Sequence, residues 1–179
     1  DPSTAAWTPE GTSAVGGIRL GVLDLLARPT PPPRTLPAPR PARPRAEPSA
    51  LMSVPFVMQT LAEVRDAASI VVEEAPSSRA AMQAYLPIVQ SETFYTMCSG
   101  GLGYAMPAAV GVALGKPGQK VIGLLGDGSA MYSIQALWSA AQLKLPITFI
   151  ILKNRRYAAL QEFAPTFGFT EGAKLEGTD

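Results

Sequence analysis

Two polar side chains stand directly after apolar segments, where strands of a buried sheet are expected to end. Asp127 follows Val121–Leu125 within the run Gly126-Asp127-Gly128-Ser129, and Asn154 follows Ile147–Leu152, 27 positions after Asp127. This interval accommodates a helix and a returning parallel strand, and in a right-handed βαβ unit both strands end at the same edge of the sheet. We therefore expect the Asp127 carboxylate and the Asn154 amide oxygen to converge at that edge.

The residue types around this edge favour a phosphate ligand and a hard cation. Gly126 and Gly128 let the backbone approach a ligand closely, and the N–H groups of Ser129 and Ala130 at a helix start suit a phosphate. One carboxylate, one amide oxygen and a backbone carbonyl form a weakly charged set of oxygen donors, which suits Mg²⁺ or Ca²⁺ shared with ligand phosphates. The sequence thus predicts a site for a metal diphosphate.

An Asp-Gly pair on its own is more often the turn of a β-hairpin. Here the residues after Gly128 have a helical period and do not form a second alternating strand. The pairing of Asp127 with Asn154, each behind an apolar segment, therefore favours the ligand site over the hairpin.

Apolar segments alternate with helical ones from residue 53 onward, which is typical of a parallel sheet flanked by helices on both faces. The fold class is therefore α/β, and we expect the sheet to be incomplete because no closing strand is evident before Asp179. The expected strands are 69–73, 121–125 and 147–152, and the expected helices are 53–67, 77–85, 106–114 and 133–144.

The N-terminal part has a different character. Residues 29–48 contain nine of the 18 prolines, and a backbone lacking so many N–H donors is expected to form an extended linker. Before it, Ile18–Ala27 has the pattern of one amphipathic helix. We expect residues 1–28 to be the tail of an upstream middle domain, and residues 49–179 to be the ligand-binding domain, truncated at its C-terminus.

Composition excludes several classes of function. The chain has no histidine and a single cysteine, Cys98, so an internal disulfide and a Cys/His zinc site are excluded and a reducing cytoplasm fits best. We expect Cys98 to be buried and inert. The longest apolar run, residues 147–152, is too short to span a membrane. Five arginines and no acid lie in residues 28–45, which leaves 10 basic and 14 acidic residues elsewhere, so no nucleic-acid partner is expected.

Two nucleotide-binding motifs are absent. Gly101-x-Gly103 resembles the start of a dinucleotide-binding fingerprint, but Met106 occupies the place of the third glycine. The segment from Gly111 to Lys116 is one residue too short for a P-loop and is followed by Pro117.

Gly126-Asp127-Gly128-Ser129 followed by Lys153-Asn154 resembles the signature of thiamine-diphosphate-dependent enzymes, with Lys153 in place of the first of two asparagines. The resemblance covers about residues 50 to 165. The segments 100–103 (GGLG), 106–109 (MPAA) and 157–160 (YAAL) look most like the benzoylformate decarboxylase branch of the 2-oxo-acid decarboxylases. Acetolactate synthases are the nearest alternative.

The resemblance implies a role for each matching residue. Metal ligands would be Asp127, Asn154 and the carbonyl of Arg156. Leu102 would hold the cofactor in a bent conformation, and the Gly100 carbonyl would accept a hydrogen bond from its amino group. Further cofactor contacts would come from Gly126, Gly128, Ser129, Ala130, Tyr132 and Tyr157, and an aryl substrate pocket would contain Ala159 and Phe163.

The resemblance also implies non-oxidative decarboxylation of a 2-oxo acid such as benzoylformate to the aldehyde, in a homodimer or homotetramer. The activating glutamate and the histidines of this branch lie outside the diphosphate domain. None of Glu63, Glu73, Glu74 and Glu92 occupies the position of that glutamate, so no catalytic residue is expected in this chain, and on its own it is expected to be inactive. A carboligase like acetolactate synthase, or a non-catalytic fragment, are the alternatives.

Overall fold

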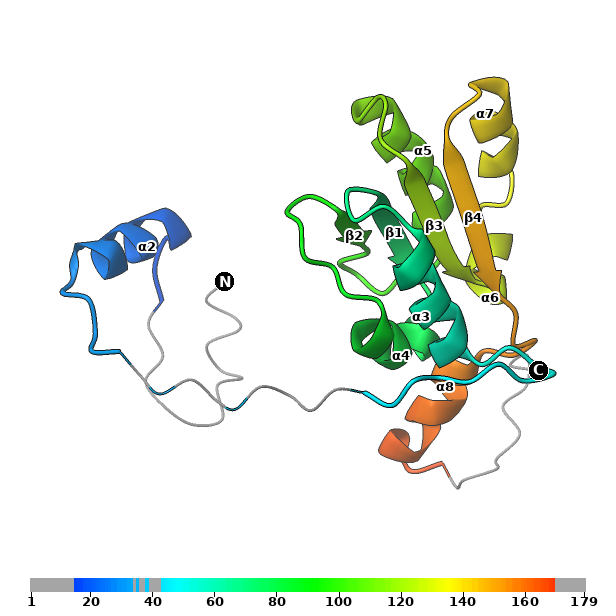
Figure 1. Ribbon diagram of the computed structural model, residues 1–179. Helices are drawn as coiled ribbons and strands as arrows, with labels where there is room; N and C mark the ends of the chain where they lie inside the picture. Colours follow the sequence, from blue (N-terminus) through cyan, green and yellow to red (C-terminus); the bar gives the residue numbers. More distant parts are fainter. Residues whose placement is uncertain (1–14, 34, 36–37, 39–42, 170–179) are drawn as a thin grey trace. The chain divides into compact units, whose positions relative to one another are not determined.

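The computed structural model describes residues 15–33, 35, 38 and 43–169 (Figure 1). Its contacts divide the chain into two compact units, Asp1–Pro41 and Ala42–Asp179. Among the described residues, no helix combines the length and the apolar character that a membrane crossing requires.

The first unit contains one described helix, α2 (Ile18–Ala27), as the sequence predicts. It ends at Ala27, and the guanidinium of the C-cap residue Arg28 pairs with the Asp24 carboxylate one turn earlier at 2.8 Å. The origin of this helix in an upstream middle domain stays a prediction, as do the proposed domain boundaries.

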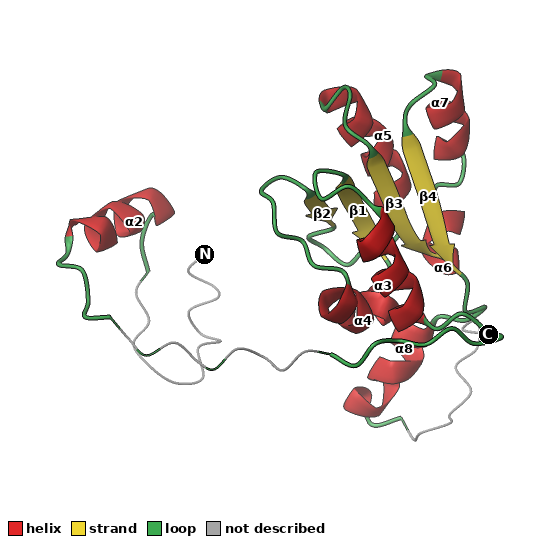
Figure 2. Cartoon of the chain, in the orientation of Figure 1, coloured by secondary structure: helices red, strands yellow, loops and turns green. Residues whose placement is uncertain are grey.

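The second unit is built on a four-stranded parallel sheet with the order β2-β1-β3-β4 (Figure 2). Its strands are β1 (Ile70–Glu74), β2 (Phe94–Thr96), β3 (Val121–Gly126) and β4 (Ile147–Leu152). The α/β class and the parallel sheet are therefore confirmed. Strand β2 was missed because three residues are too few to display a period.

Helices cover the sheet on both faces. One core contains Ile70, Val72 and Leu125 packed against α5 (Ala105–Gly115), and it also includes residues of α6 (Asp127–Met131) and α7 (Ala136–Gln142). The second core contains Val71 and Leu124 packed against α3 (Val54–Val64) and α4 (Arg79–Tyr85). Successive residues of β1 and β3 thus point into opposite cores, as the pleat requires.

Local signals set the ends of α3. The Ser53 hydroxyl accepts a hydrogen bond from Phe56 N–H at 3.3 Å, and a proline occupies the first turn. The helix ends at Val64, three residues before the expected end, because the Asp66 carboxylate accepts a hydrogen bond from Ala68 N–H at 2.8 Å and forms a turn there.

The prediction of a single helix at 133–144 is wrong about where the helix begins. A short helix, α6, begins immediately after β3, and α7 follows only from Ala136. The chain turns between them, where Ser133 N–H donates to the Ala130 carbonyl at 3.4 Å. Lys144, at φ +51°, lies beyond the end of α7 in the left-handed region.

The remaining helices are short. The 3₁₀ segment η1 (Pro76–Ser78) leads into α4, so the predicted helix at 77–85 is present in two parts. After β4, α8 (Ala158–Phe163) leads into a second 3₁₀ segment, η2 (Ala164–Phe167).

Two burial expectations need correction. Cys98 is exposed, because it lies in the loop after β2 and not under a helix. Strand β4 is only partly buried, with Ile151 40% exposed, since it is the edge strand of the described sheet.

Gly123, in the middle of β3, tests the packing between β3 and β4. A Cβ at this position would lie 2.6 Å from Cδ1 of Phe149, its partner residue on β4. We predict that Gly123→Ala lowers the free energy of unfolding by about 1–3 kcal/mol because the ring must shift in a packed core. Urea unfolding of the chain measures this.

Gly111→Ala is the matched control. Its Cβ would meet nothing within 4 Å, and it lies inside helix α5. This change is expected to stabilise the chain by about 0.5–1 kcal/mol, because alanine is the better helix former. Equal effects of the two substitutions would contradict the proposed packing.

Candidate functional site

A pocket of about 720 Å³ lies at the carboxyl ends of β1, β3 and β4. Its size is that of a small-molecule or cofactor site. It is lined by all the predicted site residues except Ala130: Gly100, Leu102, Gly126, Asp127, Gly128, Ser129, Tyr132, Asn154, Arg156, Tyr157, Ala159 and Phe163. Ala130 does not line it and is buried within the core on the α5 side of the sheet.

The loop after β4 is tied to the start of α6. Arg155 N–H donates to the Asp127 carboxylate at 2.9 Å, and Arg156 N–H donates to the Asn154 side-chain oxygen at 3.1 Å. Arg155 has φ +58°, a left-handed conformation that is unusual for a residue with a side chain. Asp127 and Asn154 therefore come together in one hydrogen-bonded turn system, as their spacing predicts.

Gly128 lies close to the ring of Tyr157. A Cβ there would lie 2.8 Å from Cε1 of Tyr157, which is too short for any real contact. The N-cap of α6, Gly126, has no side chain to accept from the first backbone amides of the helix, so no side chain caps them. These amides are free of the competition that a Ser or Asp cap would introduce.

Tyr132 and Tyr157 interact across the pocket wall. The hydrogen bond with Tyr132 raises the pKa of Tyr157 above its ordinary value, and the charge of Tyr132, partial burial and the charge of Asp127 act in the same direction. All these effects favour the neutral phenol, so Tyr157 deprotonates only at a higher pH than a free tyrosine. No pattern in the sequence indicates this contact between residues 25 positions apart.

The donor atoms present fit a divalent cation shared with a diphosphate. Only one Asp127 oxygen, Oδ2, accepts a hydrogen bond from the described residues, and the Asn154 oxygen retains a second lone pair. No cluster of three or more acidic, histidine or cysteine side chains suited to a metal exists in the described part of the chain. One carboxylate and one amide oxygen suit a hard cation that is shared with ligand phosphates.

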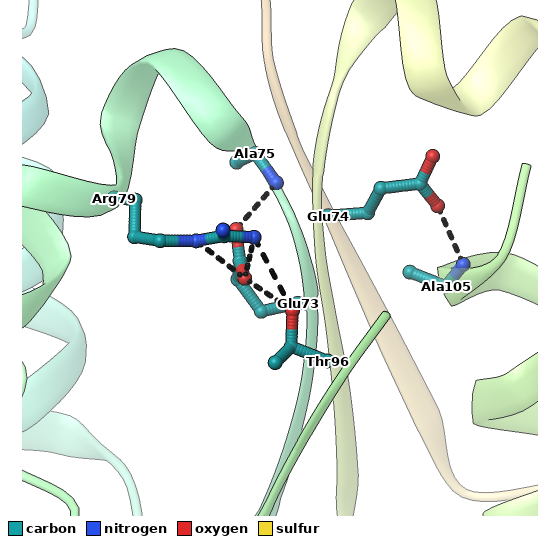
Figure 3. Close-up of polar contacts among 6 residues, drawn as sticks. All are labelled: Glu73, Glu74, Ala75, Arg79, Thr96 and Ala105. Atoms are coloured by element: carbon teal, nitrogen blue, oxygen red, sulfur yellow. Dashed lines mark hydrogen bonds and ion pairs between the residues drawn. The ribbon is translucent and has the colours of Figure 1, made fainter. Parts of the chain in front are cut away.

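Two adjacent buried glutamates support the walls of the pocket, and sequence reasoning did not find them. Figure 3 shows Glu73 and Glu74 leaving β1 toward opposite faces of the sheet. Glu73 bonds to Arg79 and Thr96, and Arg79 itself lines the pocket. In the sequence, Glu73 and Glu74 stand out as two acidic residues at the end of an otherwise apolar strand. This pattern does not show that their side chains are buried.

The predicted substrate residues share one face of α8. Ala159 and Phe163 are four positions apart, so both side chains project to the same side, and both line the pocket. Phe163 is 62% exposed, which leaves its ring available for contact. Their role toward a substrate stays a prediction.

The fold is that of a thiamine-diphosphate-binding domain. The family model described as "Thiamine pyrophosphate enzyme, C-terminal TPP binding domain" matches residues 75–176, which is more than half of the chain. The chain belongs to this family.

Individual members of the family show which enzymes the chain is similar to. The chain is 42% identical over 168 residues to benzoylformate decarboxylase of Pseudomonas aeruginosa, covering 92% of this chain and 31% of that protein. The solved thiamine diphosphate-dependent 4-hydroxybenzoylformate decarboxylase of Rhodococcus jostii RHA1 superposes with a TM-score of 0.80 at 34% identity, covering 100% of this chain and 34% of that one. Acetolactate synthase isozyme 2 large subunit of Escherichia coli is 25% identical over 114 residues, covering 63% of this chain and 21% of that protein.

The chain thus spans about a third of the length of the benzoylformate decarboxylases it matches.

Tyr132→Phe tests the contact between the two tyrosines. Removing the Tyr132 hydroxyl removes the largest cause of the raised pKa, so the pKa of Tyr157 should fall toward that of a free tyrosine. Spectrophotometric titration of the chain measures this, and Tyr157→Phe identifies which transition belongs to Tyr157. Tyr85→Phe is the control and should leave that transition in place, because Tyr85 bonds to the Pro44 carbonyl. An unchanged titration in Tyr132→Phe would contradict the contact.

Proposed function

We propose that the chain is the diphosphate- and Mg²⁺-binding part of a thiamine-diphosphate-dependent enzyme that decarboxylates an aryl 2-oxo acid, such as benzoylformate, to the aldehyde. The observation that carries this proposal is the convergence of Asp127, Asn154 and the uncapped start of α6 on one pocket. The similarity to benzoylformate decarboxylases supports the choice of reaction.

In this proposal Asp127, Asn154 and the Arg156 carbonyl would hold Mg²⁺, which would supply positive charge to offset that of the diphosphate. The backbone amides of Gly128, Ser129 and Ala130 supply further donors to the phosphate oxygens. Ca²⁺ satisfies the same oxygen set with a larger coordination sphere. The Arg155 N–H bond to Asp127 fixes the loop after β4, so the metal ligands are arranged before the cofactor arrives.

The segment 100–103 orients the organic part of the cofactor. Gly100, at φ +76°, presents its backbone to the pocket, and Leu102 contributes an apolar side chain. Tyr157 and Tyr132 lie at the same pocket beside Asp127, and the raised pKa of Tyr157 keeps its phenol neutral near the diphosphate. When bound, thiamine diphosphate supplies a thiazolium ring that accepts the electron pair released on decarboxylation.

The aryl group of the substrate is proposed to contact α8. Ala159 leaves space and Phe163 offers a ring face, and an aromatic contact of this kind contributes about 0.5–1.5 kcal/mol beyond burial. Such a margin gives an aryl substrate a preference of at most about tenfold over an aliphatic one.

The complete reaction requires residues from outside this chain. The acidic residues of β1 are not available for acid-base catalysis, because Glu73 and Glu74 are fully buried and hydrogen-bonded to neighbouring groups. We therefore place the acid-base residues elsewhere, and the chain alone is expected to bind but not to turn over. An acetolactate-synthase-like carboligase is the second candidate, because the E. coli enzyme also matches this chain.

We further propose that the protein works as a homodimer or homotetramer in the cytoplasm. An exposed apolar surface over α6 and α7 supports assembly, since a surface of this kind is usually covered by a partner. Its members are Met131, Tyr132, Ile134, Leu137 and Trp138. The single exposed cysteine is compatible with a reducing compartment.

Asp127→Ala tests the metal site. In the full-length protein this change should abolish Mg²⁺-dependent binding of thiamine diphosphate, because the diphosphate loses its bridge and its charge is no longer compensated. Isothermal titration with the cofactor, with and without Mg²⁺, measures the loss. Glu63→Ala is the control: it removes an equal charge from an exposed pair with Arg45 outside the pocket. Unchanged cofactor affinity in Asp127→Ala would place the metal elsewhere.

Phe163→Ala tests the substrate class. The intact enzyme is expected to show a higher kcat/KM for benzoylformate than for pyruvate or 2-oxoisovalerate, and Phe163→Ala should reduce this preference by up to about tenfold. Phe167→Ala, which is exposed and outside the pocket, serves as the control. A preference for pyruvate, or acetolactate as the product, would favour the carboligase and leave the cofactor assignment intact.

A further inference from the structure

Glu74, the last residue of β1, is a carboxylate with no solvent exposure. A buried carboxylate is strongly unfavourable unless it is hydrogen-bonded, so its partners indicate why it is there. Oε1 accepts from Gly103 N–H and Oε2 accepts from Ala105 N–H, each at 2.6 Å. Figure 3 shows the second of these bonds on the α5 side of the sheet. Both oxygens are thus used at the start of α5.

These bonds fix the end of the pocket-lining segment 100–103. Gly103 has φ +98°, and a Cβ there would lie 3.0 Å from Cβ of Tyr132, so its backbone is held in a crowded left-handed conformation. Gly100 and Gly101 are exposed, and Leu102 is half-buried. Within the described residues, the bond from Gly103 to Glu74 is the one hydrogen bond that any of residues 100–103 makes to the rest of the chain.

The neighbouring Glu73 serves a different segment. It points to the other face, where its carboxylate accepts from Ala75 N–H at 2.7 Å, Thr96 at 2.9 Å and the Arg79 guanidinium at 2.9 Å (Figure 3). It makes no hydrogen bond to residues 100–105. Because the two glutamates are equally buried, substituting Glu73 shows the effect of losing a buried carboxylate, and only the substitution of Glu74 also releases the segment 100–103.

We propose that Glu74 is a positioning residue of the cofactor site: by bridging Gly103 and Ala105 it sets the backbone that presents Gly100 and Leu102 to the pocket. The assignment of the pocket to thiamine diphosphate rests on the proposed function. The anchoring of the segment 100–103 by Glu74 is independent of the proposed function, because it depends only on the hydrogen bonds to Gly103 and Ala105.

Glu74→Gln is the informative substitution because it keeps the shape and removes one acceptor. The two partners are both N–H donors, so a glutamine can satisfy one with its oxygen and must direct its own N–H₂ group at the other. One amide then loses its partner, and the segment shifts. A displacement of about 1 Å at groups that orient a reacting molecule can lower the rate by about 10²-fold.

The first measurement is backbone amide hydrogen exchange of the protein without cofactor. Glu74→Gln should accelerate exchange at Gly103 and Ala105, while Glu73→Gln should leave these two amides unchanged and accelerate exchange at Ala75. Protection of Gly103 and Ala105 in Glu74→Gln equal to wild type would overturn the anchoring.

The second measurement uses the holoenzyme loaded with Mg²⁺ and thiamine diphosphate. Glu74→Gln should retain cofactor affinity by isothermal titration, since the metal ligands are untouched, but kcat and the C2 proton exchange rate of the bound cofactor should fall by about 10²-fold with KM little changed. Glu73→Gln should not slow C2 exchange. A normal C2 exchange rate in Glu74→Gln would overturn the positioning role.

A third variant and a binding control make the results decisive. If Glu74→Gln does not fold, Glu74→Asp is the alternative, because it keeps both carboxylate oxygens but shortens the side chain by one methylene. We expect faster amide exchange at Gly103 and Ala105 and slower C2 proton exchange of the cofactor in this variant. Wild-type values for both measurements would overturn the proposal. If wild-type protein does not bind the cofactor, the proposed function fails, and the amide exchange still decides whether Glu74 anchors the segment.

Discussion

The parallel pairing of β3 with β4 is the constraint on which the site depends. Gly126 pairs with Leu152, so Asp127 and the loop after β4 leave the sheet side by side, and Arg155 N–H reaches the Asp127 carboxylate. A shift of one residue in this register would turn every side chain of β4 to the other face and separate the two turns. The fully buried residues Val121–Leu125 hold the register, because both faces of β3 are packed.

The end of β1 contributes a second, electrostatic constraint. Its two glutamates are fully buried, where a carboxylate is tolerated only if it is hydrogen-bonded. Glu73 bonds to the pocket-lining Arg79, and Glu74 bonds to Gly103 at the end of the segment 100–103. Both glutamates thus connect residues around the pocket to the sheet, while Asp127 and Asn154 come from the chain directly after β3 and β4.

Some apolar side chains of the sheet edge and of α7 are exposed to solvent. Ile151 of the edge strand and Trp138 of α7 are 40% and 69% exposed, although both segments have the composition of buried elements. In the proposed homodimer or homotetramer, exposed apolar surfaces of this kind would be covered by a partner. Tyr132 belongs to the exposed apolar surface over α6 and α7 and also lines the pocket.

The amino-acid sequence by itself determined the order of the main strands and helices, the α/β class and the convergence of Asp127 with Asn154. These depend on local periodicity and on the handedness of a βαβ unit, which neighbouring residues specify. Only the tertiary structure decided the pairing of β2, the exposure of Cys98, the contact between Tyr132 and Tyr157, and the burial of Glu73 and Glu74. Each of these depends on which distant segments pack together, and the period of a single segment does not contain that information.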